Sequence, residues 1–353
     1  MAFRFRRSVK LGKGLRLNVS KRGVGVSMGT TGLRHSIHST GSRTNTIGIP
    51  GTGLSYVDRS YGDKKSSISN AVPKNEQKQA ENEWIVQQYD HYIHAITSMH
   101  QKVLESINWK EIYHTPAPFP EGEMGPLERE ASLTYDQYNP SLLERIFKRL
   151  ADKKQAELLG AIQEAKKDDE ATYRKWQQLT ELASDVLNGE SGAYERVIKN
   201  SDKFNDMRDR SVLHVINPDT VEMDVHVEPR DIIPKKKVQL TKTGKVSKRK
   251  MNKSSYYRIV NEFVCSHALW TARCLFASLP VETCVVHMTE TAINTATGHY
   301  EQRVLLSVLF DRRTMNQLNM ALVNPLDAIG NFQHHVDFRV TKGFRAVNRM
   351  TIQ

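Results

Sequence analysis

The sequence predicts a multi-domain protein with an N-terminal antiparallel β-meander, a central α-helical hairpin or bundle, and a C-terminal α+β domain. Three patterns predict this fold class. A glycine recurs every nine residues near the N-terminus. Apolar residues then recur at helical spacing over a long central segment. Short alternating segments surround one long apolar helix in the last third. The predicted boundaries are 1–58 for the β-meander, 59–75 for a polar linker, 76–200 for the helical arm and 201–353 for the α+β domain.

The glycine repeat predicts strands joined by turns. Gly14, Gly23, Gly32 and Gly41 open the units GLRLNVSKR, GVGVSMGTT, GLRHSIHST and GSRTNTIGI. Apolar residues alternate with small or polar ones in the first units, which is typical of a strand with one buried face. If Val19 pairs with Val24, the apolar residues share one face, and the loop ends at Gly23, where glycine suits a positive φ. A β-roll coil is the alternative, but its calcium-binding form needs aspartates, and residues 1–57 contain none.

A family resemblance supports this interpretation. The segment FRFRRSVKLGKGLRLNVSKRGVGVSMG, together with IGIPGTGLSY at 47–56, resembles a bacterial domain of unknown function that opens many otherwise unrelated proteins. The resemblance covers residues 1–58. It implies a small all-β module in a bacterial or phage-related setting and brings no catalytic residues. The fourth unit departs from the pattern, because Ser42, Thr44 and Thr46 replace apolar residues.

The central segment predicts two helical blocks. Apolar residues from Ile85 to Ile107 follow three- and four-residue steps, which predicts one amphipathic helix over 76–114. Four prolines within 115–126 end it. A second helical block is predicted over 141–187, ending at Asn188-Gly189. We expect the two blocks to pack together, with an exposed side available for oligomerisation.

The last third predicts an α+β domain. A strand at 221–227 precedes a basic hairpin within 234–253 that turns at Thr243-Gly244. An apolar helix at 256–279 is expected to lie across a mainly antiparallel sheet. The remaining predicted elements are strands at 281–293 and 303–312, two short helices, and a strand near 335–341.

The positive charge is concentrated in two segments. The chain carries a net charge of +12; residues 1–65 hold +11 and residues 235–253 hold +9, which leaves −8 for the rest. Such concentration indicates a polyanionic partner, either nucleic acid or an anionic lipid surface. Solubility, or contact with an acidic partner protein, is the alternative.

The candidate polyanion-binding residues are the aromatic and basic side chains of these two segments. They are Phe3, Arg4, Phe5, Arg6, Arg7, Lys10, Lys13, Arg16, Lys21 and Arg22 in the first segment, and Lys235, Lys236, Lys237, Lys248, Arg249 and Lys250 in the second. Alternating aromatic and basic residues at 3–6 suit base stacking with phosphate contact, or an anchor at a bilayer surface. The alternative is that the two phenylalanines complete the core of the sheet.

The evidence for catalysis is weaker. A metal-dependent nuclease would use Glu222, Asp224 and Glu228, but no acid-x-lysine triplet accompanies them. Cysteine and histidine pairs such as Cys265/His267 are spaced so that they face apart, which argues against zinc. No GxSxG elbow and no phosphate-binding glycine motif is present. We therefore predict no cofactor, no metal and no catalytic residue.

These observations predict a non-enzymatic binding and assembly protein of bacterial or phage-related origin. The basic β-module would dock on a polyanion, and the arm would form a homo-oligomer or contact a protein partner; by analogy, a sensor in anti-phage defence is one setting. Three cysteines in a long chain, and no apolar run of about 18 residues, favour the cytoplasm, with peripheral membrane attachment as a variant. The alternatives are a nuclease and a subunit that binds an acidic partner.

Overall fold

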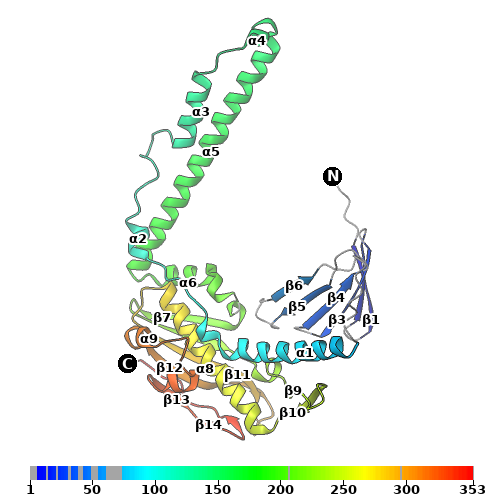
Figure 1. The fold of residues 1–353 in the computed structure, drawn as a ribbon. Coiled ribbons are helices and arrows are strands. Elements are labelled where there is room, and N and C mark those ends of the chain that lie inside the picture. The colour runs from blue at the N-terminus through cyan, green and yellow to red at the C-terminus, as the bar shows by residue number, and fades with distance from the viewer. Residues whose placement is uncertain are drawn as a thin grey trace. The chain divides into compact units, whose positions relative to one another are not determined.

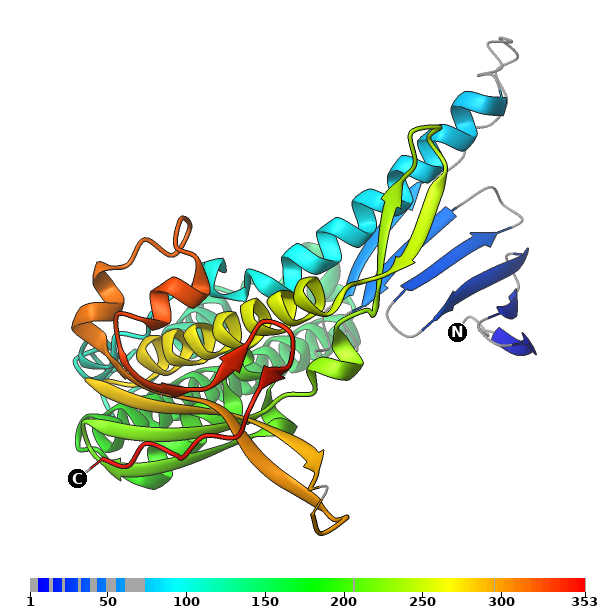
Figure 2. The ribbon, with the colours of Figure 1, turned by 90° about the horizontal axis from the view of Figure 1, so that it is seen from below.

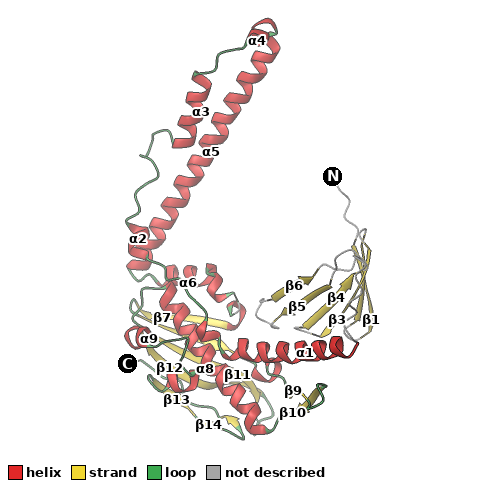
Figure 3. Ribbon diagram, in the orientation of Figure 1, coloured by secondary structure: helices red, strands yellow, loops and turns green. Residues whose placement is uncertain are grey.

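The structure is a computed structural model that combines helices and sheets (Figure 3). Side chains are described from residue 78 onward. The described backbone comprises 6–12, 15–20, 23–30, 33–38, 43–48, 55–60, 74–205, 207–294 and 296–352. Residues 78–353 form a mixed α+β structure, as the sequence predicts. The chain divides into two compact units, one formed by Met1–Glu105 with Val197–Gln353 and the other by Ser106–Arg196.

Six N-terminal strands pair in the order of the sequence. Each strand is antiparallel to the next, and Val19 lies opposite Val24, with Leu17 opposite Val26. This pairing places alternate residues of neighbouring strands on the same face. The strands are β1 (Arg6–Gly12), β2 (Leu15–Ser20), β3 (Gly23–Thr30), β4 (Leu33–His38), β5 (Arg43–Gly48) and β6 (Ser55–Ser60).

A five-stranded sheet forms the centre of the C-terminal part of the first unit. Its strand order is β13-β12-β11-β8-β7, and only β8 and β11 run parallel to each other. A parallel pair needs a crossover connection, which the long helix α8 (Lys253–Ser278) supplies. The strands are β7 (Ser211–Asn217), β8 (Thr220–His226), β11 (Thr283–Ile293), β12 (Tyr300–Asp311) and β13 (Gln333–Val336). The mainly antiparallel sheet with a helix across it therefore matches the sequence-based expectation.

Helix α8 covers one face of this sheet. Its N-terminus is capped by Asn252, whose side chain accepts a hydrogen bond of 2.7 Å from the Ser255 amide. Apolar and small residues surround most of the helix, and it packs against β11 and β12. At the other end, the Arg312 guanidinium donates to the carbonyl groups of Phe276, Leu279 and Val281. These bonds satisfy carbonyl groups that a helix end leaves without partners.

Helix α1 (Lys74–Thr97) packs against α8 and the basic hairpin (Figure 2). Because α1 ends at Thr97, the prediction of one continuous helix over 76–114 is wrong beyond that residue. The hydroxyl groups of Thr97 and Ser98 bond to the carbonyls of Ile93 and His94, which competes with further helical bonding. The chain then passes through a short turn, η1 (Met99–Gln101), and an extended segment to α2 (Trp109–Tyr113).

The second unit is built around α5 (Lys148–Leu187) (Figure 1). It packs with α2, α3 (Pro126–Asp136) and α4 (Leu142–Ile146). Helix α2 lies at the end of the first predicted helical block, so this part of the block contacts the second block. Packing of the rest of the first block against α5 stays a prediction. Buried Asp169 of α5 accepts a 2.8 Å hydrogen bond from the Glu128 amide and caps α3. The predicted end at Asn188-Gly189 is confirmed, and α6 (Ser191–Asn200) follows.

The remaining elements are short. Helix α7 (Pro229–Ile232) precedes the hairpin, and α9 (Arg312–Gln317) and α10 (Pro325–Ile329) follow β12. Two short turns, η2 (Asp202–Phe204) and η3 (Arg208–Arg210), lead into β7. A small hairpin of β14 (Phe338–Arg339) and β15 (Gly343–Phe344) lies near the C-terminus. Helices α3 and α6 and strand β7 were not predicted from the sequence.

Candidate functional site: a basic hairpin and its pocket

The basic hairpin is formed by β9 (Lys236–Leu240) and β10 (Val246–Lys250). Gly244 in its turn has φ of +72°, a conformation that favours glycine. The predicted turn at Thr243-Gly244 is therefore confirmed. Asn82 of α1 donates a 2.9 Å hydrogen bond to the Gly244 carbonyl, which ties the hairpin to α1.

Like charges lie directly opposite each other across this hairpin. Lys236 is paired with Lys250, and Lys237 with Arg249, in the strand register. All six predicted residues of this segment, Lys235, Lys236, Lys237, Lys248, Arg249 and Lys250, are exposed. Among the described residues, none of the six forms an ion pair. Like charges directly opposite in a ladder are destabilising, so the hairpin carries uncompensated positive charge.

The strand alternation divides these charges between the two faces of the hairpin. Lys236, Lys248 and Lys250 share a face with half-buried Val238, Leu240 and Val246, while Lys237 and Arg249 point to the other face. Helix α1 lies against both strands. The apolar residues give this helix a surface to pack on, and the long basic side chains remain in water.

A pocket of about 360 Å³ lies at the base of the hairpin, where β9 begins and β10 ends. Six basic side chains from different parts of the first unit line it: Arg230, Lys235, Lys250, Lys253, Arg303 and Lys342. The sole lining carboxylate is that of Glu290, which accepts a 2.8 Å hydrogen bond from Arg303 Nε and is nearly buried. The lining therefore has a formal excess of five positive charges. Tyr256, Tyr257 and Phe344 supply aromatic surface to the same pocket.

The C-terminal hairpin closes one side of this pocket. Gly343 has φ of +79°, and a Cβ atom there would lie 2.6 Å from the Tyr257 ring. Only glycine allows this close approach together with the left-handed backbone. The neighbouring Lys342 and Phe344 are thereby held at the pocket wall.

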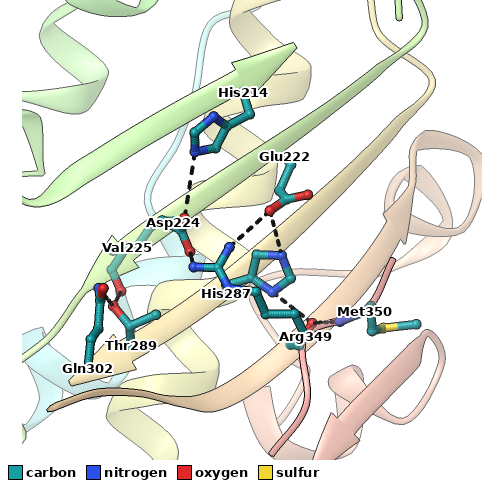
Figure 4. Close-up of polar contacts among 10 residues, drawn as sticks. His214, Glu222, Asp224, Val225, His287, Thr289, Gln302, Arg349 and Met350 are labelled. Carbon is teal, nitrogen blue, oxygen red and sulfur yellow. Dashed lines mark hydrogen bonds and ion pairs between the residues drawn. The ribbon is translucent and has the colours of Figure 1, made fainter. Parts of the chain in front are cut away.

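A second polar cluster lies on β7, β8, β11 and β12 (Figure 4). Glu222 and Asp224 share one face of β8, as their spacing predicts. The Arg349 guanidinium binds both, at 3.1 Å from Glu222 Oε1 and 2.6 Å from Asp224 Oδ1. His214 Nε2 lies 3.7 Å from Asp224. One arginine of the C-terminal segment thus balances two adjacent carboxylates.

Buried His287 lies beneath this arginine. Its Nδ1 is 2.8 Å from Ser307 Oγ, and Ser307 Oγ also accepts a hydrogen bond from the Met350 amide. The serine hydroxyl is then free to donate to Nδ1, which places the ring proton on Nε2, 3.1 Å from Glu222 Oε1. Burial, more than the neighbouring charges, lowers the pKa of His287, so the ring is neutral at pH 7. Arg349 and Met350 belong to the C-terminal segment and bond to side chains of β8 and β12, so this network joins that segment to the sheet.

The three carboxylates considered for a nuclease do not lie together. Glu228 directly precedes α7 as its N-cap residue, and its Oε1 lies 3.5 Å from His226 Nε2. Glu222 and Asp224 are instead bound by Arg349. Within the part of the chain that the structure describes, no three His, Cys, Asp or Glu side chains are grouped to hold a metal ion. The nuclease alternative remains an untested prediction.

The cysteines lie in the core. Cys265, Cys274 and Cys284 are free and buried. Burial raises the pKa of Cys265 to about 12 and also raises that of Cys284. Such thiols behave as small apolar side chains, because the reactive thiolate is disfavoured.

The N-terminal candidate residues are described only in part. Arg6, Arg7 and Lys10 lie on β1 and Arg16 on β2, for which only the backbone is described. The other six, Phe3, Arg4, Phe5, Lys13, Lys21 and Arg22, lie outside the described residues.

Several pocket residues were not predicted from the sequence. Arg303 lies opposite Glu290 in the β11–β12 register, so pairing the two predicted strands could have indicated their ion pair. Tyr256-Tyr257 directly follows the basic segment. Arg230 and Lys342 are distant in sequence and are brought to the pocket only by the fold. Arg349 and Ser307 likewise carry no local sequence signal for their contacts.

None of the helices that the structure describes is both long enough and apolar enough to span a lipid bilayer. Comparison with known proteins shows that the model of a family described as "Protein of unknown function (DUF4236)" matches residues 3–57. No curated protein and no solved structure matches the chain. The predicted resemblance is thereby confirmed for this segment. Over residues 3–57 alone, the chain is similar to a domain family whose function is unknown.

Proposed function

We propose that this protein is a non-enzymatic nucleic-acid-binding and assembly protein whose basic hairpin contacts the phosphate backbone. The observation that carries the proposal is the uncompensated charge of β9 and β10, where Lys236 lies opposite Lys250 and Lys237 opposite Arg249. Neutralising these pairs with phosphates removes their mutual repulsion and releases counterions. A two-stranded ribbon is also a known way to reach into a nucleic-acid groove.

Nucleic acid fits this surface better than an anionic membrane does. An interfacial anchor needs exposed apolar or aromatic side chains beside the basic ones. None of the large exposed apolar side chains among the described residues lies on β9, β10 or their turn. The aromatic residues near the hairpin instead line the pocket, where they are available to a base but not to a bilayer.

The N-terminal β-meander and the helical arm complete the proposal. The β-meander, with its ten candidate residues, is a second docking element for the same polyanion. The arm within the predicted domain 76–200 mediates homo-oligomerisation or contact with a protein partner. The protein acts in the bacterial cytoplasm, and phage sensing is one setting for such an assembly.

Fluorescence anisotropy with the full-length protein tests this function. Labelled mixed-sequence single-stranded and duplex DNA are titrated at about 50 and about 150 mM salt. The test variant changes five hairpin residues to Gln: Lys236, Lys237, Lys248, Arg249 and Lys250. The control variant changes five exposed lysines of α5 to Gln: Lys148, Lys153, Lys166, Lys167 and Lys175. The two variants lose the same charge, so only the position differs.

We expect wild type and the α5 control to bind at both salt concentrations and the hairpin variant to bind far more weakly. For single strands, each lost phosphate contact should reduce the salt slope by about 0.7. Equal binding by both variants would overturn the hairpin as the contact surface. A third variant, Arg4→Gln with Arg6→Gln and Arg7→Gln, measures the contribution of the β-meander. Parallel titration with vesicles containing phosphatidylserine identifies a lipid surface, should that be the true partner.

A further inference from the structure

We infer that the pocket at the base of the hairpin binds a nucleotide with a terminal phosphate monoester, either as a free nucleotide or at the end of a strand. This inference rests on the proposed function and adds a specificity to it. The pocket volume of about 360 Å³ lies within the range of small-molecule sites, about 300–1,000 Å³. The pocket combines aromatic surface with a strong excess of positive charge, which is the chemistry of a nucleotide site.

The charge favours a monoester over the diester of a continuous strand. Five side chains line the pocket and have no ion-pair partner among the described residues: Arg230, Lys235, Lys250, Lys253 and Lys342. A terminal phosphate carries about −1.5 to −2 charges near neutral pH, whereas a phosphodiester carries one. The terminal group therefore balances more of the excess charge. Lys253 also opens the 26-residue helix α8, whose N-terminal dipole favours an anion.

An unpaired hydroxyl group provides a second, independent observation. Tyr256 Oη is buried and has no hydrogen-bond partner among the described residues. Buried hydroxyl groups are normally bonded, and each exception needs an explanation. Tyr256 lines the pocket, and burial raises its pKa, so the hydroxyl keeps its proton at neutral pH. A phosphate or sugar oxygen of the ligand would accept this proton in a hydrogen bond.

The pocket wall is organised before any ligand enters. The Arg303–Glu290 pair fixes one side, and the Met251 amide bonds to the Lys235 carbonyl at 3.0 Å to hold the base of the hairpin. Gly343 also lies against the Tyr257 ring. Because these contacts already hold the pocket wall, mainly the ends of the lysine side chains become ordered when a ligand binds. This lowers the entropic cost of binding.

The test compares two single-stranded DNA oligonucleotides of one sequence, one with a 5′-phosphate and one with a 5′-hydroxyl. Both are titrated into the full-length protein at neutral pH. We expect the phosphorylated strand to bind tenfold or more tightly, as one or two charged hydrogen bonds would give. The preference should be lost in Lys253→Gln with Lys342→Gln. It should persist in the matched control, Arg258→Gln with Arg345→Gln, whose exposed side chains do not line the pocket.

Tyr256→Phe removes only the hydroxyl group and keeps the ring. We expect it to reduce the preference for the phosphorylated strand severalfold while leaving binding of the 5′-hydroxyl strand unchanged. A nucleoside 5′-monophosphate serves as competitor. If it displaces the phosphorylated strand, the pocket takes free nucleotides; if it fails to compete while the strand preference holds, the pocket is specific for strand ends.

The outcomes separate this inference from the proposed function. Equal binding of the two strands, without binding of the monophosphate, overturns the pocket inference, although hairpin-dependent binding would still support the proposed function. Binding of the monophosphate without binding of either strand supports the pocket and overturns the proposed function. The comparison of the two strands on wild-type protein needs no variant, so a variant that misfolds does not obscure the result.

Discussion

His267 shows how a single buried ring couples stability to pH. It lies in the core on α8, where its Nδ1 is 3.0 Å from the Phe263 carbonyl and its ring packs on the Phe263 ring at 4.2 Å. Burial, with a smaller contribution from nearby Lys102, lowers its pKa to about 4. The ring is therefore neutral in the folded protein at pH 7. In the unfolded chain its pKa returns to about 6.5.

We predict that the free energy of unfolding falls as the pH drops from 7.5 to 5. The sign follows from linkage, since the unfolded state binds a proton below about pH 6.5 and the folded state does not until about pH 4. His267 alone should contribute a loss of about 2 kcal/mol at pH 5. Urea unfolding at the two pH values measures this loss. His267→Gln should show a smaller fall than wild type, and the exposed control His299→Gln the same fall; equal falls in all three would contradict the prediction.

Two other polar side chains of α8, Ser266 and Arg273, have partners on the segment that follows α1. Ser266 Oγ lies 2.9 Å from His100 Nδ1 and accepts a hydrogen bond from the His100 amide. Arg273 donates to the carbonyls of His100 and Lys102. These bonds fix the extended segment that follows α1, because its carbonyl groups find partners on α8 instead of in a continued helix.

At the scale of elements, the sequence predicted the helices, strands and turns that have a strong local signal, such as a long apolar run, an alternating run or turn residues. Helix α8 and strands β8, β11 and β12 lie close to their predicted positions, because each carries a long apolar or alternating run. The hairpin turn at Gly244 was predicted from turn chemistry. The end of α1 at Thr97 was not predicted, since apolar spacing continues to Ile107. The hydroxyl bonds of Thr97 and Ser98 end the helix locally, and tertiary bonds from Arg273 hold the segment that follows.

The candidate site was predicted only in part, for the same reason. The six basic residues of the hairpin segment form two short runs in the sequence, 235–237 and 248–250, and were identified from charge alone. Arg230, Arg303 and Lys342 reach the pocket from separate elements, and no local pattern connects them. Likewise Glu222 and Asp224 were recognised as sharing a face, but their partner Arg349 is more than a hundred residues away. Contacts of this kind follow from the fold and not from spacing.

The C-terminal segment gives a prediction at this scale. Arg349→Gln leaves Glu222 and Asp224, two residues apart on one face of β8, without a cation between them. We expect a loss of about 1–2 kcal/mol in the free energy of unfolding at pH 7.5, because charged hydrogen bonds are lost from a site that is only partly exposed. Urea unfolding measures the loss.

Arg345→Gln is the matched control for this variant. Its guanidinium pairs with Asp337 at 3.8 Å, and both side chains are about half exposed. Such surface pairs contribute little, so we expect a change below about 0.5 kcal/mol. If the two variants are equally stable, the C-terminal segment does not depend on its contact with the carboxylates.

At the scale of the whole molecule, the second unit presents an apolar surface that its own helices do not cover. Leu142 and Ile146 of α4 are 78% and 73% exposed, and Leu150 of α5 is 51% exposed. Helix α4 and the adjoining start of α5, which carry these residues, lie at the end of the second unit that is remote from α2 (Figure 1). Apolar side chains gathered in this way are typical of a protein contact surface. The predicted homo-oligomer would place this surface at its interface.

We predict that Leu142→Glu with Ile146→Glu and Leu150→Glu dissociates the predicted homo-oligomer. Each buried leucine or isoleucine contributes about 1.5–3 kcal/mol to an interface, so three glutamates should weaken association by at least about a hundredfold. Light scattering after gel filtration, over a range of protein concentrations, gives the mass. The control Leu159→Glu with Leu179→Glu changes two exposed leucines elsewhere on α5 and should keep the mass of wild type. A wild-type mass equal to one chain at every concentration would reject homo-oligomerisation and leave this surface for a different protein partner.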